Sequence, residues 1–208
     1  MLGPHRERFA LVLGCLALLA TGCATATTEV PPQAASGLLE MRSALVDAKG
    51  QVQKTTSAAK DMVDQPRQDV GAQINAFSDA LAKLNSDALQ ARQLGAGAQA
   101  RADDYFTQWD AKLKTLSGQL AEAGQQRRQE SAASFAKLQE RVGALRTQFA
   151  PFMTDLQATD RFLKADPTPS GVKAASPTLR KALDQEAGIL KSADEVIAQI
   201  DVVRGGNK

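Results

Sequence analysis

Histidine and cysteine are almost missing from this 208-residue chain, which has one histidine and two cysteines. Aromatic residues make up only 4% of the sequence, and no stretch alternates polar and apolar residues as a surface strand would. His5, Cys15 and Cys23 all lie within the first 23 residues, so in the rest of the chain nucleophilic catalysis and transition-metal binding lose their usual side chains. No calcium-loop motif is present either. These absences predict a protein with no catalytic site, no metal and no cofactor.

Neither sign of charge dominates the sequence. The chain has 25 basic and 23 acidic residues, for a net charge of +2. Such a balance gives no electrostatic reason to expect a nucleic acid as partner. Alanine, glutamine, leucine and charged residues are abundant instead, which is the composition of long helices and coiled coils. A chain of this kind buries a narrow apolar seam along its length.

Residues 1–22 resemble the signal peptide of a bacterial lipoprotein. Two arginines precede an apolar stretch at 9–19 that is too short to span a bilayer, and small residues then lead to Cys23. In lipoproteins the peptide is cut before this cysteine, which receives acyl groups such as palmitate. The resemblance implies a lipid on Cys23. Because Ala24 stands where an aspartate would favour the inner membrane, it also implies the periplasmic face of the outer membrane. An ordinary secretory peptide is the alternative.

Both ends of the mature chain are predicted to lack regular structure. Residues 23–37 are small and polar and include Pro31-Pro32, so we expect a lipidated, disordered tether. Two glycines stop the last helix, and residues 205–208 are expected to fray. The terminal Lys208 resembles the lysine through which some outer-membrane lipoproteins are linked to peptidoglycan.

Apolar residues recur every three or four positions through the rest of the chain, which predicts long helices. We expect three, at about 38–93, 99–164 and 177–203, with two glycines in a turn at 94–98. Short turns make neighbouring helices antiparallel. The prediction for residues 38–204 is therefore an all-α fold: an elongated antiparallel coiled coil or three-helix bundle, from which a two-helix hairpin tipped by residues 85–112 projects.

Three prolines fall inside this pattern. Pro66 interrupts the first helix, and we expect one long bent helix or two helices lying end to end. Pro151 is expected to kink the second helix without ending it, because the apolar rhythm continues on both sides. Ser176-Pro177 is interpreted as the N-cap and first residue of the last helix.

The second predicted helix carries two candidate binding regions. Tyr105, Phe106 and Trp109 form the single aromatic cluster, which either seals the hairpin as core or serves as an interaction patch at its tip. Between Ala123 and Phe135 the stripe steps by four three times, through the polar residues Arg127 and Ser131, and this stutter locally unwinds a supercoil. This stutter motivates a second hypothesis, the binding of a small molecule or lipid between splayed helices.

From Tyr105 onward the sequence resembles an uncharacterised bacterial family, the domain-of-unknown-function family 2959. The matching features are Phe106-x-x-Trp109, Pro151 after Phe149, Phe162-Leu163-Lys164, and Ala193-Asp194-x-x-Ile197. The turn that we expect at 166–171, between the last two predicted helices, departs from the family at its start, with Ala165-Asp166-Pro167 in place of a His-Asn-Leu-like run. The resemblance implies a helical envelope lipoprotein with no known activity.

These observations predict a membrane-anchored envelope lipoprotein whose bundle acts as a spacer or docking arm and has no chemistry of its own. Its partners would be the membrane, through Cys23, and an unidentified envelope protein or peptidoglycan. Four alternatives stay open: ligand binding between splayed helices, a peptidoglycan link through Lys208, a cryptic enzyme that uses buried Lys, Asp or Glu, and a helical homo-oligomer secreted without lipid.

Overall fold

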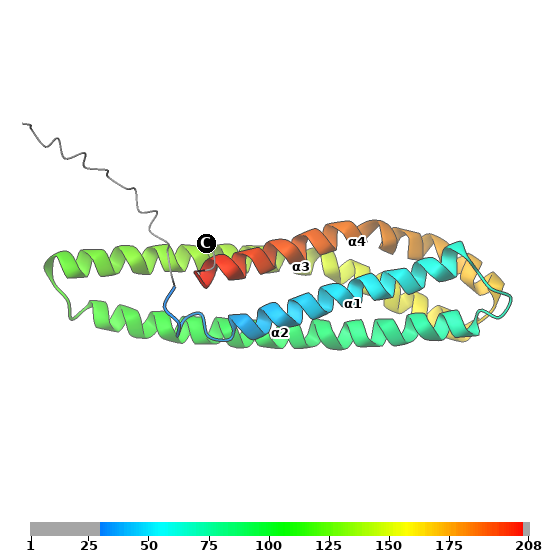
Figure 1. The fold of residues 1–208 in the computed structure, drawn as a ribbon, viewed down its shortest axis with the longest axis horizontal. Helices are drawn as coiled ribbons and strands as arrows, with labels where there is room; N and C mark the ends of the chain where they lie inside the picture. Colours follow the sequence, from blue (N-terminus) through cyan, green and yellow to red (C-terminus); the bar gives the residue numbers. More distant parts are fainter. Residues whose placement is uncertain (1–29, 206–208) are drawn as a thin grey trace, which may run out of the picture.

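The computed structural model describes residues 30–205, and within them it contains helices and turns but no strand. The helices are α1 (Leu38–Asp64), α2 (Gly71–Leu113), α3 (Gly118–Ala165) and α4 (Pro169–Val203). Helices adjacent in sequence pack against each other, and α1 also packs against α4, so the four close into an antiparallel bundle (Figure 1). The predicted all-α, elongated bundle is confirmed, with four helices in place of three.

A two-helix hairpin projects from one end of the bundle, as predicted. α2 and α3 have 43 and 48 residues, whereas α1 and α4 have 27 and 35. The two longer helices therefore continue beyond the shorter pair (Figure 1). The tip of this hairpin is the turn at 114–117 and not residues 85–112.

The interruption at Pro66 is a full reversal of the chain, so the prediction of one helix, or two end to end, over 38–93 is wrong. α1 ends at Asp64 and α2 begins at Gly71, running back along α1. Proline removes a backbone donor and disfavours helix in the residue before it, which ends α1. The apolar rhythm is the same for a bent helix and for a hairpin, so it could not distinguish them.

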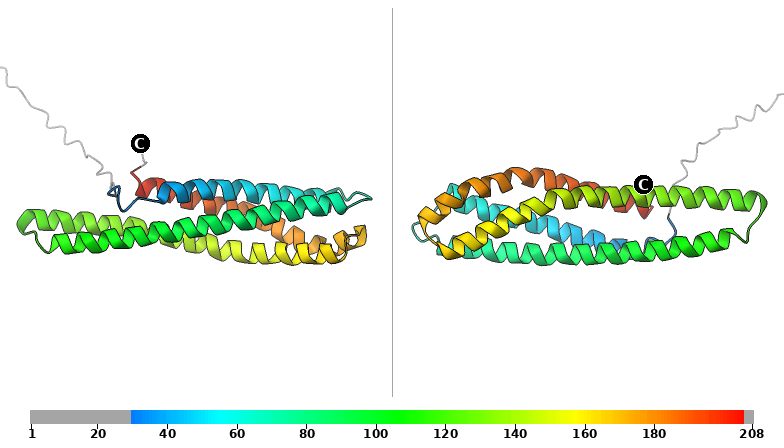
Figure 2. Two further views of the ribbon diagram at one scale, coloured as in Figure 1. Left: turned by 90° about the horizontal axis from the view of Figure 1, so that it is seen from below. Right: turned by 180° about the vertical axis from the view of Figure 1, so that it is seen from behind.

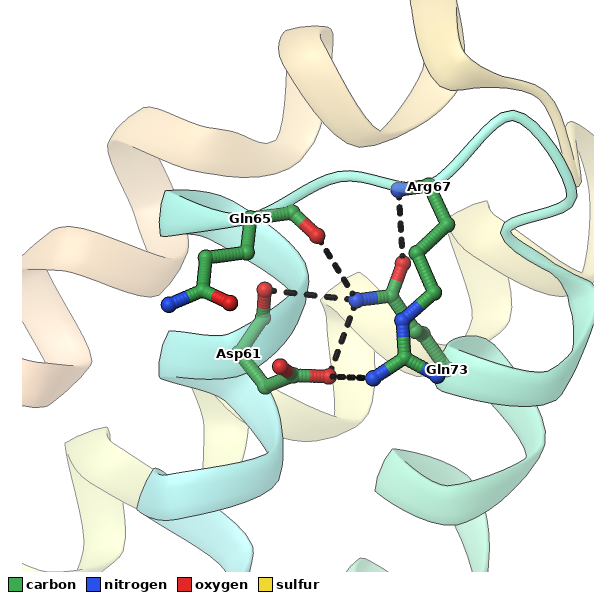
Figure 3. Close-up of polar contacts among 4 residues, drawn as sticks. All are labelled: Asp61, Gln65, Arg67 and Gln73. Atoms are coloured by element: carbon green, nitrogen blue, oxygen red, sulfur yellow. Dashed lines mark hydrogen bonds and ion pairs between the residues drawn. The ribbon is translucent and has the colours of Figure 1, made fainter.

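The side chain of Gln73 closes this turn (Figure 3). Its amide nitrogen donates to the Asp61 carboxylate at 2.9 Å and to the backbone carbonyls of Gln65 and Asp61 at 3.0 and 3.3 Å. Its amide oxygen accepts from the backbone N–H of Arg67 at 3.1 Å. A helix end leaves its last carbonyls without partners, and Gln73, which is only 3% exposed, supplies one from the next helix.

The glycines at 94–98 do not form a turn but lie inside α2. Each glycine costs a helix about 1 kcal/mol relative to alanine, and burial of the neighbouring Ala91, Ala98 and Ala102 outweighs that cost. The chain reverses instead at 114–117, and Gly118, which follows this turn and begins α3, has a φ of 60°. The second predicted helix, 99–164, is therefore divided: its first part belongs to α2 and the rest to α3.

α4 begins eight residues before the predicted start at 177, since its first residue is Pro169. The Thr168 hydroxyl accepts a hydrogen bond from the Gly171 N–H at 3.0 Å and caps the helix. Pro177 lies inside α4 on its exposed side, where water can hydrogen-bond the carbonyl that proline leaves without a donor. Pro151 also lies inside α3 and does not end it, as predicted.

Residues 30–37 are packed on the bundle, so the prediction of a disordered tether is wrong for this part of 23–37. Val30 and Ala34 are 2% and 0% exposed and join a core cluster with Ala98 and Ala102 of α2. Arg101 holds the segment by donating from Nε to the Ser36 carbonyl at 3.1 Å. Residues 23–29 and the C-terminal 206–208 lie outside the described residues, as do Cys23 and Lys208.

Candidate ligand-binding site

The aromatic cluster of α2 makes the contacts of a packed core. Phe106 is 8% exposed, and its ring meets Phe135 of α3 edge-on with ring centroids 5.4 Å apart. The Arg128 guanidinium stacks 4.4 Å from the centre of the Phe106 ring. Tyr105 and Trp109 are half-buried beside it. The cluster joins α2 to α3 at the base of the hairpin, and its binding to a partner stays a prediction.

Several charged side chains of the described residues link neighbouring helices, and none of them forms a metal site. Residues 30–205 contain no cluster of three His, Cys, Asp or Glu side chains that could hold a metal ion. Arg42 of α1 donates to Asp201 of α4 at 2.8 Å, and this hydrogen bond, together with the carboxylate charge, raises the pKa of Arg42.

No helix in this part of the chain combines the length and apolarity that crossing a bilayer requires.

The feature that stands apart from this packing is a cavity of about 770 Å³ in the middle of the bundle. All four helices line it, and its walls are mostly apolar. Its volume lies within the roughly 300–1,000 Å³ of small-molecule sites. Representative wall residues are Leu45 and Val52 of α1, Phe135 and Met153 of α3, and Ile189 and Val196 of α4.

The cavity opens to solvent between α2 and α3. Its lining residues on α1 and α4 are buried or half-buried, whereas every exposed lining residue belongs to α2 or α3. Leu89 and Arg92 stand on the α2 side of this mouth, and Gly143 and Arg146 on the α3 side. Leu89 is 52% exposed, so an apolar side chain is presented to solvent at the opening.

The contacts between α2 and α3 explain why the mouth lies where it does. Toward the hairpin tip, Arg128 of α3 pairs with Asp110 of α2 at 2.9 Å, next to the Phe106–Phe135 contact. Toward the other end of the bundle, Ser78 of α2 donates a hydrogen bond to Asp160 of α3. Between these contacts α3 runs obliquely to α2 (Figure 2), and the facing residues line the cavity.

Small side chains keep this middle section open. Ala88, Gly95 and Ala96 of α2 face the cavity, and so do Gly143 and Ala150 of α3. The sequence prediction placed the opening at the stutter, 123–135, but the cavity lining of α3 begins only at Phe135. The signal that could have located it is the group of small residues at 88–98, of which the part at 94–98 was interpreted as a turn.

The charged residues of the lining are all basic. Lys49, Arg92 and Arg146 line the cavity, and none of its described lining residues is acidic. Lys49 is paired with Asp194 at 2.6 Å. Arg92 and Arg146 form no ion pair or hydrogen bond with another described residue. The mouth therefore carries two guanidinium groups whose charge no described protein group neutralises.

Comparison of the chain with family models, with curated proteins and with solved structures finds no match.

Proposed function

We propose that this chain is a lipid-anchored envelope protein whose bundle binds an apolar small molecule or lipid in the cavity that opens between α2 and α3, without chemistry of its own. The observation that carries the proposal is the apolar cavity of about 770 Å³, open to solvent on one side. A bundle that acted only as a spacer would gain stability by closing this space, because each buried methylene contributes about 0.8 kcal/mol. An open apolar cavity therefore favours binding over a purely mechanical role.

The anchor is proposed from the sequence alone, since Cys23 lies outside the described residues. The lipoprotein-like layout of 1–23 supports acylation of Cys23 and a place on the periplasmic face of the outer membrane. Labelling of cells with a fatty-acid analogue tests this. We expect the wild-type chain to be labelled and Cys23→Ser not to be; equal labelling of both would refute the anchor. The resemblance to family 2959 also stays a prediction.

Binding is tested with Nile red, an uncharged dye that fluoresces in apolar surroundings, and the full chain carrying Cys23→Ser. We expect displacement of the dye by linear alcohols. Affinity should rise about fourfold with each added methylene until the cavity is full, because each methylene contributes about 0.8 kcal/mol. Displacement that does not depend on chain length would contradict a cavity of defined size.

A pair of glycine substitutions separates the cavity from the surface. An added Cβ at Gly143 or at Gly50 meets no atom within 4 Å, so both positions accept a larger side chain. Gly143 lies in the mouth, whereas Gly50 lies on α1 outside the lining. Gly143→Phe should weaken dye binding at least about tenfold, and Gly50→Phe should leave it unchanged. Equal effects would place the dye elsewhere.

A docking role is a second candidate, favoured by the exposed apolar side chains near the hairpin tip. Leu116 and Leu120 are 44% and 72% exposed. Such residues at the end of a projecting hairpin are suited to contact a partner in the envelope. Photo-cross-linking from position 120 in cells should capture a specific partner, and the same probe at exposed Gln90 should not; no difference would contradict docking through the tip.

A further inference from the structure

We propose that the cavity binds a fatty acid, with its carboxylate held between Arg92 and Arg146 and its alkyl chain lying along α3 toward Phe135. This inference rests on the proposed function, because it names the ligand class of the same cavity. Three independent observations carry it: the sign of the charge at the mouth, the position of the two arginines across the mouth, and the length of the apolar wall beyond them.

The sign of the charge selects an anionic ligand. Arg92 and Arg146 are exposed at the mouth, and no acidic residue lines the cavity in the described chain. Elsewhere on the bundle the arginines of the helix contacts are paired, as Arg42 is with Asp201 and Arg128 with Asp110. Two unpaired guanidinium groups beside an apolar cavity attract an anion and repel a cationic amphiphile.

The two arginines face the mouth from opposite sides. The Phe106–Phe135 contact and the hydrogen bond between Asn85 and Gln157 fix the antiparallel register of α2 and α3. In this register, Arg92 lies within about one helical turn of Arg146, across the gap between the helices. A planar guanidinium fork matches the two oxygens of a carboxylate, and one such group on each side holds the head at the opening.

The wall beyond the arginines has the length of one acyl chain. From Arg146 to Phe135, α3 rises about 16 Å at ~1.5 Å per residue. The apolar core of a bilayer is about 30 Å thick and two chains deep, so one chain needs roughly 15 Å. This part of the cavity is lined by apolar side chains from the other helices, including Leu38 and Met41 of α1 and Val196 of α4. A single alkyl chain therefore fits with its head at the mouth.

The test compares hexadecanoate with hexadecanol, which has the same chain and no charge, by displacement of Nile red from the full chain carrying Cys23→Ser. We expect the wild-type cavity to prefer hexadecanoate by about tenfold or more, because charge-assisted hydrogen bonds contribute to its binding alone. In the double variant Arg92→Gln and Arg146→Gln the preference should disappear while hexadecanol binds as before. Arg161→Gln, an exposed position of α3 outside the cavity, should keep the preference.

Reversal of the charge gives a second readout. The double variant Arg92→Glu and Arg146→Glu should bind hexadecyltrimethylammonium more tightly than hexadecanoate, the opposite of the wild-type order. The head-group inference is overturned if the wild type shows no preference for hexadecanoate, or if the preference survives the double glutamine substitution. Hexadecyl phosphate binding more tightly than hexadecanoate would assign the site to a phosphate head. If hexadecanol itself does not bind, or Gly143→Phe does not weaken it, the proposed function fails first.

Discussion

Replacement of Gln73 tests whether one side chain holds the first turn of the bundle. Gln73 makes four hydrogen bonds, one of them to a carboxylate, and they close the loop between α1 and α2. A hydrogen bond contributes about 1 kcal/mol net. The Gln65 carbonyl is on the exposed side of the loop and can turn to water, so part of this is recovered. We expect Gln73→Met, which keeps the volume, to lower the free energy of unfolding by about 2–4 kcal/mol.

The assay is urea unfolding followed by circular dichroism, with thermal melting as a second measure. For a chain of this size, 1 kcal/mol corresponds to a shift of about 2–4 °C in Tm, so the expected loss is about 5–15 °C. Gln90→Met, at an exposed position of the same helix, is the matched control and should change stability by less than about 0.5 kcal/mol.

Gln73→Glu separates the hydrogen bonds from the packing. A carboxylate cannot donate to the carbonyls of Asp61 and Gln65, and it places a second negative charge beside the Asp61 carboxylate. At pH 7 this variant should therefore be less stable than Gln73→Met. If Gln73→Met loses less than about 1 kcal/mol, or Gln73→Glu is the more stable of the two, the turn is held by Pro66 and the apolar core.

Further predictions for the two glycines, for the α4 cap and for the core use the same unfolding assay. Gly50→Ala should stabilise the chain by about 0.5–1 kcal/mol, because the position is helical and its Cβ meets no atom within 4 Å; a destabilised variant would contradict this geometry. Gly171→Ala should destabilise the chain by about 1–3 kcal/mol, because the added Cβ would lie 2.2 Å from the backbone carbonyl oxygen of Asp166. Thr168→Ala should cost about 1 kcal/mol, because the N-terminal cap of α4 is lost. Leu156 is fully buried, so Leu156→Ala should cost about 2–5 kcal/mol. Leu120 is 72% exposed, so Leu120→Ala should cost almost nothing. Similar losses for the two variants would contradict the burial of Leu156 in the core.

The periodicity of the sequence was sufficient to predict an all-α, elongated, antiparallel fold, because the period of the apolar residues decides between helix and strand. It was not sufficient to count the helices. A proline that bends a helix and one that begins a turn interrupt the rhythm in the same way. At Pro66 the turn is closed by Gln73, which hydrogen-bonds Gln65 eight residues earlier in the chain, and the apolar pattern does not reveal this role.

The sequence predicted the kind of candidate site, a binding site between splayed helices, but not its position. The hypothesis of binding between splayed helices was prompted by a stutter at 123–135, whereas the cavity lies beyond it. Glycine was interpreted as a breaker at Gly95 and Gly97, but in this bundle α2 continues through both. Small residues within a long helix can mark where its neighbours stand apart, and only the packing of all four helices shows which of these meanings applies.

The position of Val30 has a consequence for how the rod would sit at a membrane. Val30 and Val203 belong to one core cluster near the waist of the molecule, so the chain enters and leaves the bundle at its flank and not at either end (Figure 1). From Cys23 to Val30 the backbone reaches at most about 25 Å at roughly 3.6 Å per residue. An acylated Cys23 would thus attach the bundle to the membrane through its side, by a segment of seven residues. A bundle perpendicular to the bilayer would then require a second attachment, whereas a bundle parallel to the bilayer would require none.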